Sequence, residues 1–176
     1  MDKYPCAQAC WKYLISCWGR RRCDGQQLLR YTANCASRVS PPFTTDLRRR
    51  FSSAFPDQTD DYAREWKRIW WVMSTVCMTV LWTQRNQVVH NGGQVTIASS
   101  VAAFQQAGLR QLRALARRER GNPRTIVQGT RLLICLDLFQ RTPREAPRSE
   151  ASHVQPPGSS QVPALITWLR TFQTLS

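Results

Sequence analysis

Residues 66–91 constrain the fold of this 176-residue chain more than any other stretch, because they hold four of its seven tryptophans. Apolar side chains recur there at steps of three and four residues, which is the spacing of one face of an α-helix. The middle of the stretch is apolar nearly all round, so other helices must cover it. Aspartates precede the stretch and two glycines follow it, as is common at helix ends. The recurring positions are Trp66, Trp70, Met73, Cys77, Val80, Leu81, Gln84 and Val88. Those that we expect at the centre of the fold are Trp66, Trp70, Met73, Cys77 and Leu81.

The uncharged run inside this helix covers residues 69–84 and is too short to cross a membrane. A membrane-spanning helix needs about 20 apolar residues, and shorter runs are usually buried core helices. Ser74, Thr75 and Thr79 dilute the run further. We therefore predict no membrane span.

The remaining sequence predicts an all-α fold, with a single small domain of four to six helices in residues 1–141. Apolar periodicity predicts helices over residues 5–18, 26–39, 45–55 and 94–120 around the long tryptophan-rich one. We expect Leu28, Leu29 and Ala33 on the inward face of the helix at 26–39, and Thr45 as the cap of the next helix. Residues 125–140 favour a further helix, although their short apolar run leaves a strand open. Proline, serine and glycine in residues 142–163 predict a flexible linker. Residues 164–176 predict a short amphipathic C-terminal helix.

The charge of the chain is strongly basic, with 25 Lys and Arg against 11 Asp and Glu and a net charge of +14. All but three of the basic residues are arginines, which bind phosphate through two parallel N–H groups and stack on bases. Two arginine triplets and a basic face on the helix at residues 110–120 are the candidate phosphate contacts, although solvated clusters without a partner would look the same. The candidate residues are Arg20, Arg21, Arg22, Arg48, Arg49, Arg50, Arg110, Arg113, Arg117, Arg118 and Arg120.

Two segments carry a resemblance to a known family. Residues 5–18 read P-C-A-Q-A-C-W-K-Y-L-I-S-C-W, and residues 81–90 read L-W-T-Q-R-N-Q-V-V-H. The first resembles the end of the zinc-binding domain in reverse transcriptases of non-LTR retrotransposons, where Cys-Pro-x-Ala-x-x-x-Trp precedes a further Leu and Trp. The second is similar to the aromatic-x-x-Arg-Asn signature downstream of that domain. The resemblance covers residues 1–92, and its matching positions are Cys6, Trp11, Trp18, Trp82, Arg85 and Asn86.

The resemblance implies that Cys6 is a vestigial zinc ligand, the last of its set. The Cys pair and His that would complete the site would lie upstream of Met1, so we expect no zinc and no other cofactor. Cys6 and Cys10 stand four residues apart and could share a metal, although two buried small side chains explain them as well.

The sequence predicts no catalysis. Its only histidines are His90 and His153, and no Ser-His-Asp set, carboxylate pair or Gly-rich phosphate loop is present. The family resemblance implies that the catalytic core of the reverse transcriptase is missing from this chain. Seven cysteines without a C-x-x-C pair do not predict a disulfide framework, and the N-terminus has no signal-peptide pattern. We expect an intracellular protein, nuclear or cytoplasmic, that is not an enzyme.

Two functional hypotheses follow. The first is a non-catalytic segment of a retroelement polyprotein that binds DNA or RNA weakly and without sequence preference. The second is a basic helical module that binds a protein partner and has no nucleic-acid role.

Overall fold

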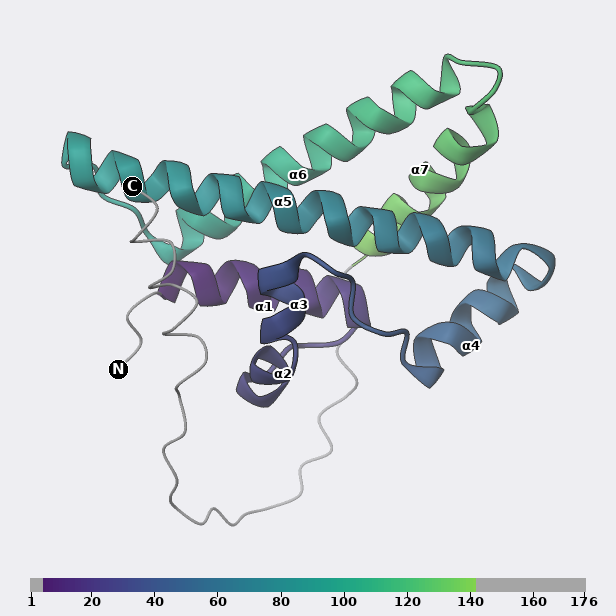
Figure 1. Ribbon diagram of the computed structural model, residues 1–176, viewed down its shortest axis with the longest axis horizontal. Helices are drawn as coiled ribbons and strands as arrows, with labels where there is room; N and C mark the ends of the chain where they lie inside the picture. The colour runs from purple at the N-terminus through teal and green to yellow at the C-terminus, as the bar shows by residue number, and fades with distance from the viewer. Residues whose placement is uncertain (1–4, 142–176) are drawn as a thin grey trace, which may run out of the picture. The chain divides into compact units, whose positions relative to one another are not determined.

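The long helix α5 (Thr59–Asn91) contacts α1, α4, α6 and α7, and so confirms the prediction of one central tryptophan-rich helix. The structure is a computed structural model and describes residues 5–141, all of whose regular elements are helices (Figure 1). The linker and the C-terminal helix predicted for residues 142–176 lie outside the described residues. The other elements are α1 (Pro5–Gly19), α2 (Gly25–Arg30), α3 (Thr32–Ser37), α4 (Thr45–Ala54), the 3-10 turn η1 (Pro56–Gln58), α6 (Ile97–Arg120) and α7 (Ile126–Gln140).

The ends of α5 follow the residues that the sequence offers there. Asp60 and Asp61 lie in the first turn, where negative charge favours the helix dipole. Gly92 adopts a φ of 62° and ends the helix in the left-handed conformation that glycine adopts without strain. Between these ends the helix has 33 residues, about 50 Å at 1.5 Å per residue.

The core is a cluster of aromatic rings around Trp66. Its indole ring meets Trp18 of α1 at 6.2 Å and Phe51 of α4 and Phe139 of α7 at 5.5 Å each, measured between ring centroids. Trp70, one turn further on, meets Trp18 at 5.4 Å and 71°. Aromatic pairs in such edge-to-face geometry contribute about 0.5–1.5 kcal/mol beyond the area they bury. One residue of α5 thus joins three other helices.

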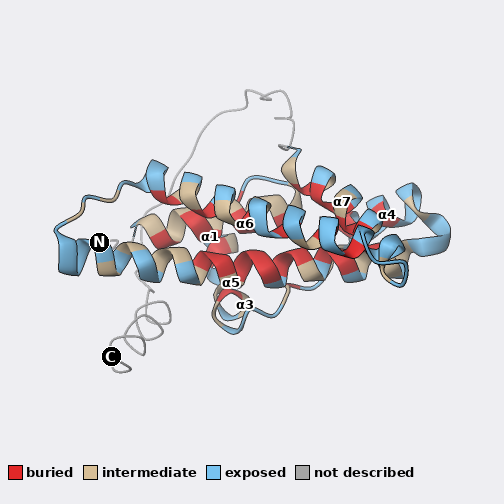
Figure 2. Cartoon of the chain, turned by 90° about the horizontal axis from the view of Figure 1, so that it is seen from above, coloured by how far each residue is buried: buried red, intermediate tan, exposed pale blue. Residues whose placement is uncertain are grey.

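Four of the five residues expected at the centre are fully buried: Trp66, Trp70, Met73 and Cys77. Leu81 is only half-buried, and Val88 is 46% exposed although the sequence placed it on the inward stripe. Figure 2 shows why, because the buried residues of α5 stop before its C-terminal end, where neighbouring helices no longer cover it. The apolar spacing continues beyond the part of the helix that packs.

Two local predictions need correction. The predicted helix 26–39 is divided at Tyr31, which has φ −99° and ψ 9°, so α2 and α3 are separate and the described residues hold seven α-helices. This break turns Leu29 outward, 50% exposed, and exposes Ala33, although both were expected inside. The cap of α4 is Thr44 rather than Thr45, because the Thr44 hydroxyl accepts from the Leu47 N–H. Residues 126–140 form a helix, so the strand left open for them is excluded.

Two buried glycines of α6 and α7 set how closely the helices approach one another. A β-carbon on Gly129 would stand 2.8 Å from the Ala116 carbonyl oxygen and 2.8 Å from the Arg120 nitrogen, both backbone atoms of α6. A β-carbon on Gly108 would instead meet the flexible side chain of Met73. Only the first position holds two backbones in direct contact.

We predict that Gly129→Ala lowers the free energy of unfolding by about 1–3 kcal/mol, because α7 must move away from α6. Alanine alone would favour a helix by about 1 kcal/mol over glycine. Gly108→Ala is the matched control and should cost less, since Met73 can change rotamer. Urea titrations of both variants measure this. A Gly129→Ala protein as stable as the wild type would contradict the close backbone contact.

Candidate nucleic-acid interface

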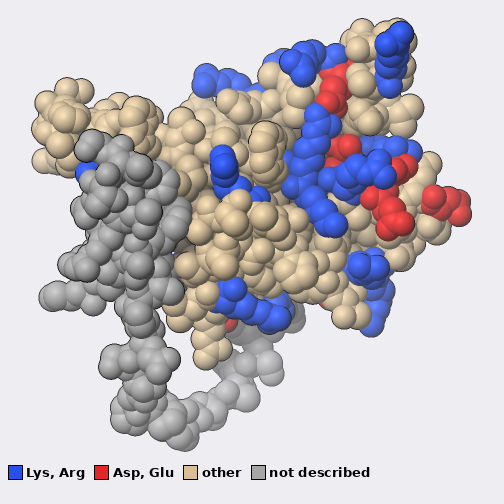
Figure 3. Space-filling view, viewed as in Figure 1, with Lys and Arg blue, Asp and Glu red and all other residues tan. Residues whose placement is uncertain are grey.

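The predicted basic face of α6 lies on the solvent side of that helix. Arg110, Arg113, Arg117 and Arg120 are exposed, whereas Phe104, Leu112 and Ala116 on the opposite side are fully buried. Figure 3 shows Lys and Arg atoms recurring along the upper edge, where Figure 1 places α6. The face runs from Arg110 to Arg120, about 15 Å of helix axis. We call these four residues the α6 arginine face.

The α6 arginine face has almost no internal partners. Arg113 donates to the Gln140 side-chain oxygen at 2.9 Å, and no carboxylate of the described residues pairs with any of the four. Arg118 is exposed and equally unpaired within residues 5–141. Five of the described carboxylates are engaged in ion pairs elsewhere: the pairs are Arg50–Asp46, Arg64–Asp61, Arg131–Asp61, Arg141–Asp137, Arg68–Glu65 and Arg68–Glu119. These five acidic side chains neutralise other arginines and leave the α6 arginine face without a carboxylate partner.

Glu119, the one acidic residue of α6, is buried and points inward. Both of its oxygens accept from the Arg68 guanidinium of α5, which also donates to Glu65 at 3.2 Å. Burial raises the pKa of Glu65, and the neighbouring Arg68 opposes that rise. Arg68 is therefore a structural cation between α5 and α6 and is not available to a phosphate.

Arg20 also has a structural partner, which the sequence did not predict. It adopts a φ of 53° at the end of α1, and its guanidinium donates to the carbonyl of Leu138 and, at 3.2 Å, to that of Arg141. These carbonyls end α7 and have no partner inside the helix. Burial lowers the pKa of Arg20, and the nearby charges of Arg50 and Arg141 lower it further. Three arginines from α1, α4 and the end of α7 therefore gather at one place.

The other predicted contacts differ in their surroundings. Arg21, Arg22 and Arg49 are exposed, and Arg50 is more than half exposed but paired with Asp46 at 3.0 Å. Arg141 and Lys67 were missed because neither belongs to an arginine triplet or to the basic face of α6. Only the packing of the helix ends brings Arg141 beside the arginine triplets.

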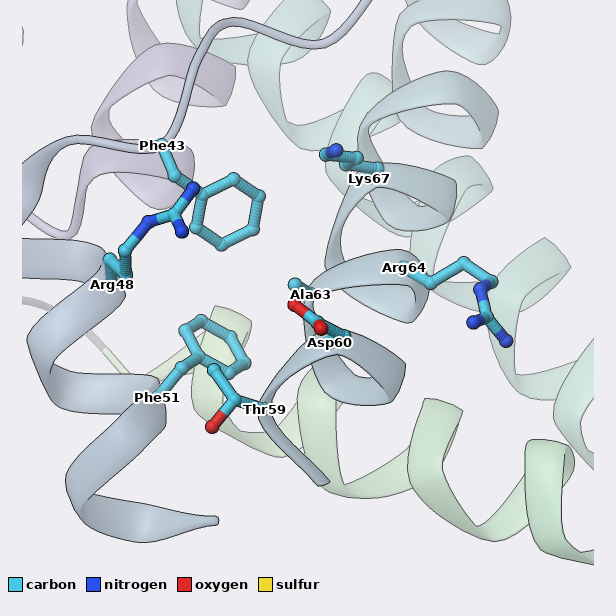
Figure 4. A pocket seen from close by; sticks show the side chains of 8 residues that line it. All are labelled: Phe43, Arg48, Phe51, Thr59, Asp60, Ala63, Arg64 and Lys67. Atoms are coloured by element: carbon cyan, nitrogen blue, oxygen red, sulfur yellow. The ribbon is translucent and has the colours of Figure 1, made fainter. Parts of the chain in front are cut away.

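Arg48 lines a cavity of about 260 Å³ between α4 and the start of α5. Phe43 and Phe51 form its apolar side, and Lys67 holds its ammonium 5.8 Å from the centre of the Phe43 ring. Figure 4 shows Arg48 reaching toward Phe43, while Arg64 turns its guanidinium away. The remaining lining residues are Thr59, Asp60, Ala63 and Arg64. Cations beside an aromatic ring are suited to a nucleotide, whose neutral base stacks on the ring while its negatively charged phosphate meets the cation.

The residues of the family resemblance fall into two environments. Trp11 and Trp18 are buried in the core, and Cys6 beside them in α1 is half-buried. Trp82 and Arg85 are exposed near the C-terminal end of α5, and Asn86 in the same part of the helix is half-buried. The first segment therefore has a packing role that needs no ligand.

The cysteines do not assemble a metal site within residues 5–141, where no three metal-binding side chains come together. Cys10, which could have shared a metal with Cys6, is fully buried, and its thiol hydrogen-bonds with Cys77 of α5. That hydrogen bond lowers the pKa of Cys10, and burial raises the pKa of Cys77. The pair packs α1 against α5.

No family model, curated protein or solved structure matches this chain. Among the described helices, none is long and apolar enough to cross a membrane.

We predict that the stability of Glu65→Gln, measured relative to the wild type at the same pH, is greater at neutral pH than in acid. A raised pKa means that the folded state binds the proton more tightly than the unfolded state. The contribution of Glu65 protonation to the free energy of unfolding is thus fully present below the ordinary carboxyl pKa, about 4.3. It is lost as the pH rises through the raised pKa of the folded state. Glutamine keeps an oxygen for Arg68 without a charge to desolvate.

The measurement is urea unfolding of the variant and the wild type at about pH 4, close to the ordinary carboxyl pKa, and at about pH 7, well above it. The stability of Glu65→Gln relative to wild type should rise with pH. Glu119→Gln is the control and should lose stability at neutral pH, because it breaks a two-pronged ion pair. A Glu65→Gln difference that does not change with pH would contradict the shift.

Proposed function

We propose that this chain is a non-catalytic module that binds DNA or RNA through phosphate contacts, with the α6 arginine face as its main surface. One observation carries the proposal: four exposed arginines on one side of a helix have no carboxylate partner among the described residues. Unpaired guanidinium groups bind phosphate without first breaking an ion pair. The net charge of +14 also draws the chain toward polyanions.

The geometry favours binding without sequence preference. Phosphate contacts position a protein on nucleic acid but carry no sequence information. A duplex carries one charge per about 1.7 Å of its axis, so a face about 15 Å long can meet several phosphates. Arg20, Arg50 and Arg141 form a second group of cations, in which Arg50 and Arg141 are already paired with carboxylates.

The cavity beside Arg48 supports contacts with single strands as well. A base that is not paired can lie against Phe43 while its phosphate meets Arg48 or Lys67. A base inside a duplex has no such access. The proposal therefore includes both forms of nucleic acid.

We further propose that the chain derives from the end of a non-LTR retrotransposon polyprotein. The motif positions Cys6, Trp11, Trp18, Trp82 and Arg85 support this origin by resemblance. The genomic DNA upstream of the codon for Met1 tests it directly. A reverse-transcriptase frame that ends in a Cys pair and a His is expected, and unrelated sequence there would argue against this origin without touching the binding proposal.

We predict that Arg110→Glu with Arg117→Glu weakens binding to all sequences alike. Binding through phosphates releases counterions, so the logarithm of affinity falls with the logarithm of salt by about 0.9 for each phosphate neutralised on B-DNA. The variant should show a smaller slope of log affinity against log salt, because the protein neutralises about one phosphate fewer for each arginine that is replaced. A salt titration with fluorescent single- and double-stranded oligonucleotides measures both the affinity and the slope.

The matched control is Arg30→Glu with Arg38→Glu, which changes the net charge equally at exposed positions of α2 and the end of α3. This control should bind much more tightly than the α6 variant, close to the wild type. Equal affinities of the two variants would mean that only the overall charge matters. Binding that ignores salt would contradict the phosphate contacts altogether.

A further inference from the structure

The outer side of α5 carries a stripe of apolar side chains that the described helices leave partly or largely exposed. Trp71 is 58% exposed and Trp82 57% exposed, and Val89 further along is also largely exposed. Large apolar side chains gathered on one exposed surface mark an interaction site more often than a single one does. The stripe faces away from the buried side of the helix, where Met73 and Cys77 lie.

The spacing of the stripe is that of a coiled coil. Its positions follow one another at alternating steps of four and three residues, the a and d pattern of a heptad. They are Trp71, Thr75, Met78, Trp82, Arg85 and Val89. Thr75 and Met78 are half-buried, and Met78 also packs against the core, so their outer edges alone belong to the stripe. This pattern extends over about 27 Å of helix axis, and residues 71–84 within it hold no charged side chain.

The last turns of α5 also need support that the described residues do not provide. None of residues 82–91 is buried. Thr83, Asn86, Val88, Val89 and Asn91 are weak helix formers, and short helices without packing are marginal in water. A partner along the stripe would stabilise this end of the helix.

We propose that the stripe pairs with the same stripe of a second copy of this chain, as an antiparallel two-helix contact. An antiparallel pair centred on Val80 sets Trp71 against Val89 of the other copy, Met78 against Trp82, and Thr75 against Arg85. The two Arg85 side chains then lie about 15 Å apart along the axis, beyond the Debye length of about 8–10 Å. A parallel pair would instead face Arg85 with its own copy.

The uncharged middle of the stripe also favours a second copy over a charged partner, because it offers no charge for an acidic or basic surface to match. A helix pair of this length buries on the order of 1,000 Å² in total, the lower size of specific interfaces. Each copy contributes two tryptophans to the contact. Tryptophan is among the residues that dominate the binding energy of protein interfaces. This inference is independent of nucleic-acid binding, since it rests on the apolar stripe of α5 and not on the α6 arginine face.

The test is sedimentation equilibrium of the nuclease-treated full chain, at a salt concentration high enough to release nucleic acid. The wild type should form dimers, and Trp82→Ala should weaken dimerisation at least tenfold. Leu29→Ala is the control, because Leu29 is as exposed but lies outside the stripe. It should leave the dimerisation constant unchanged.

Thr75→Glu tests the orientation. In the antiparallel pair the new carboxylate meets Arg85 of the other copy and should tighten dimerisation, whereas a parallel pair would set two glutamates together. Adding Arg85→Glu to this variant should then weaken dimerisation below the wild type. A chain that stays monomeric at every accessible concentration overturns the proposal, whether or not it binds vesicles or other proteins. Weakening by Thr75→Glu overturns the antiparallel pairing.

Discussion

The contact of Trp18 with Trp66 and Trp70 is the interaction on which the rest of the fold depends. It joins α1 to the middle of α5, and Phe51 and Phe139 add α4 and α7 to the same ring cluster. The indole N–H groups of Trp18, Trp66 and Trp70 are buried without a hydrogen-bond acceptor in the described part of the chain. An unsatisfied buried donor costs about 1–3 kcal/mol, which the packing of the ring cluster must offset.

The arrangement of charge follows from this core. Because the apolar side of α6 must face α1, α5 and α7, its arginines are left in water. Two carboxylates join helices: Glu119 of α6 pairs with Arg68 of α5, and Asp61 of α5 pairs with Arg131 of α7. Five arginines without a carboxylate partner in the described residues therefore lie on one helix, α6. The apolar stripe of α5 lies on a different surface, so nucleic-acid binding and self-association need not compete.

Periodicity was sufficient to predict the long central helix, its buried tryptophans and the outward face of α6, because each depends on the spacing of residues within one element. The roles of Arg20, Arg68 and Arg141 could not be predicted, since each depends on which helix ends meet. Leu29 and Val88 were misplaced for a related reason: an apolar side chain is buried only where another element arrives to cover it. The stripe from Trp71 to Val89 shows the same limit, because the sequence drew attention to the inward face alone.

The free energy of unfolding of Trp70→Ala tests the central claim most directly. Trp70 is fully buried and meets Trp18 across the α1–α5 contact. Its replacement by alanine should lower the free energy of unfolding by about 3–5 kcal/mol, the usual cost of truncating a large core side chain. Urea titration followed by circular dichroism gives the value. A change within a few tenths of a kcal/mol would contradict the placement of the tryptophan cluster at the centre of the fold.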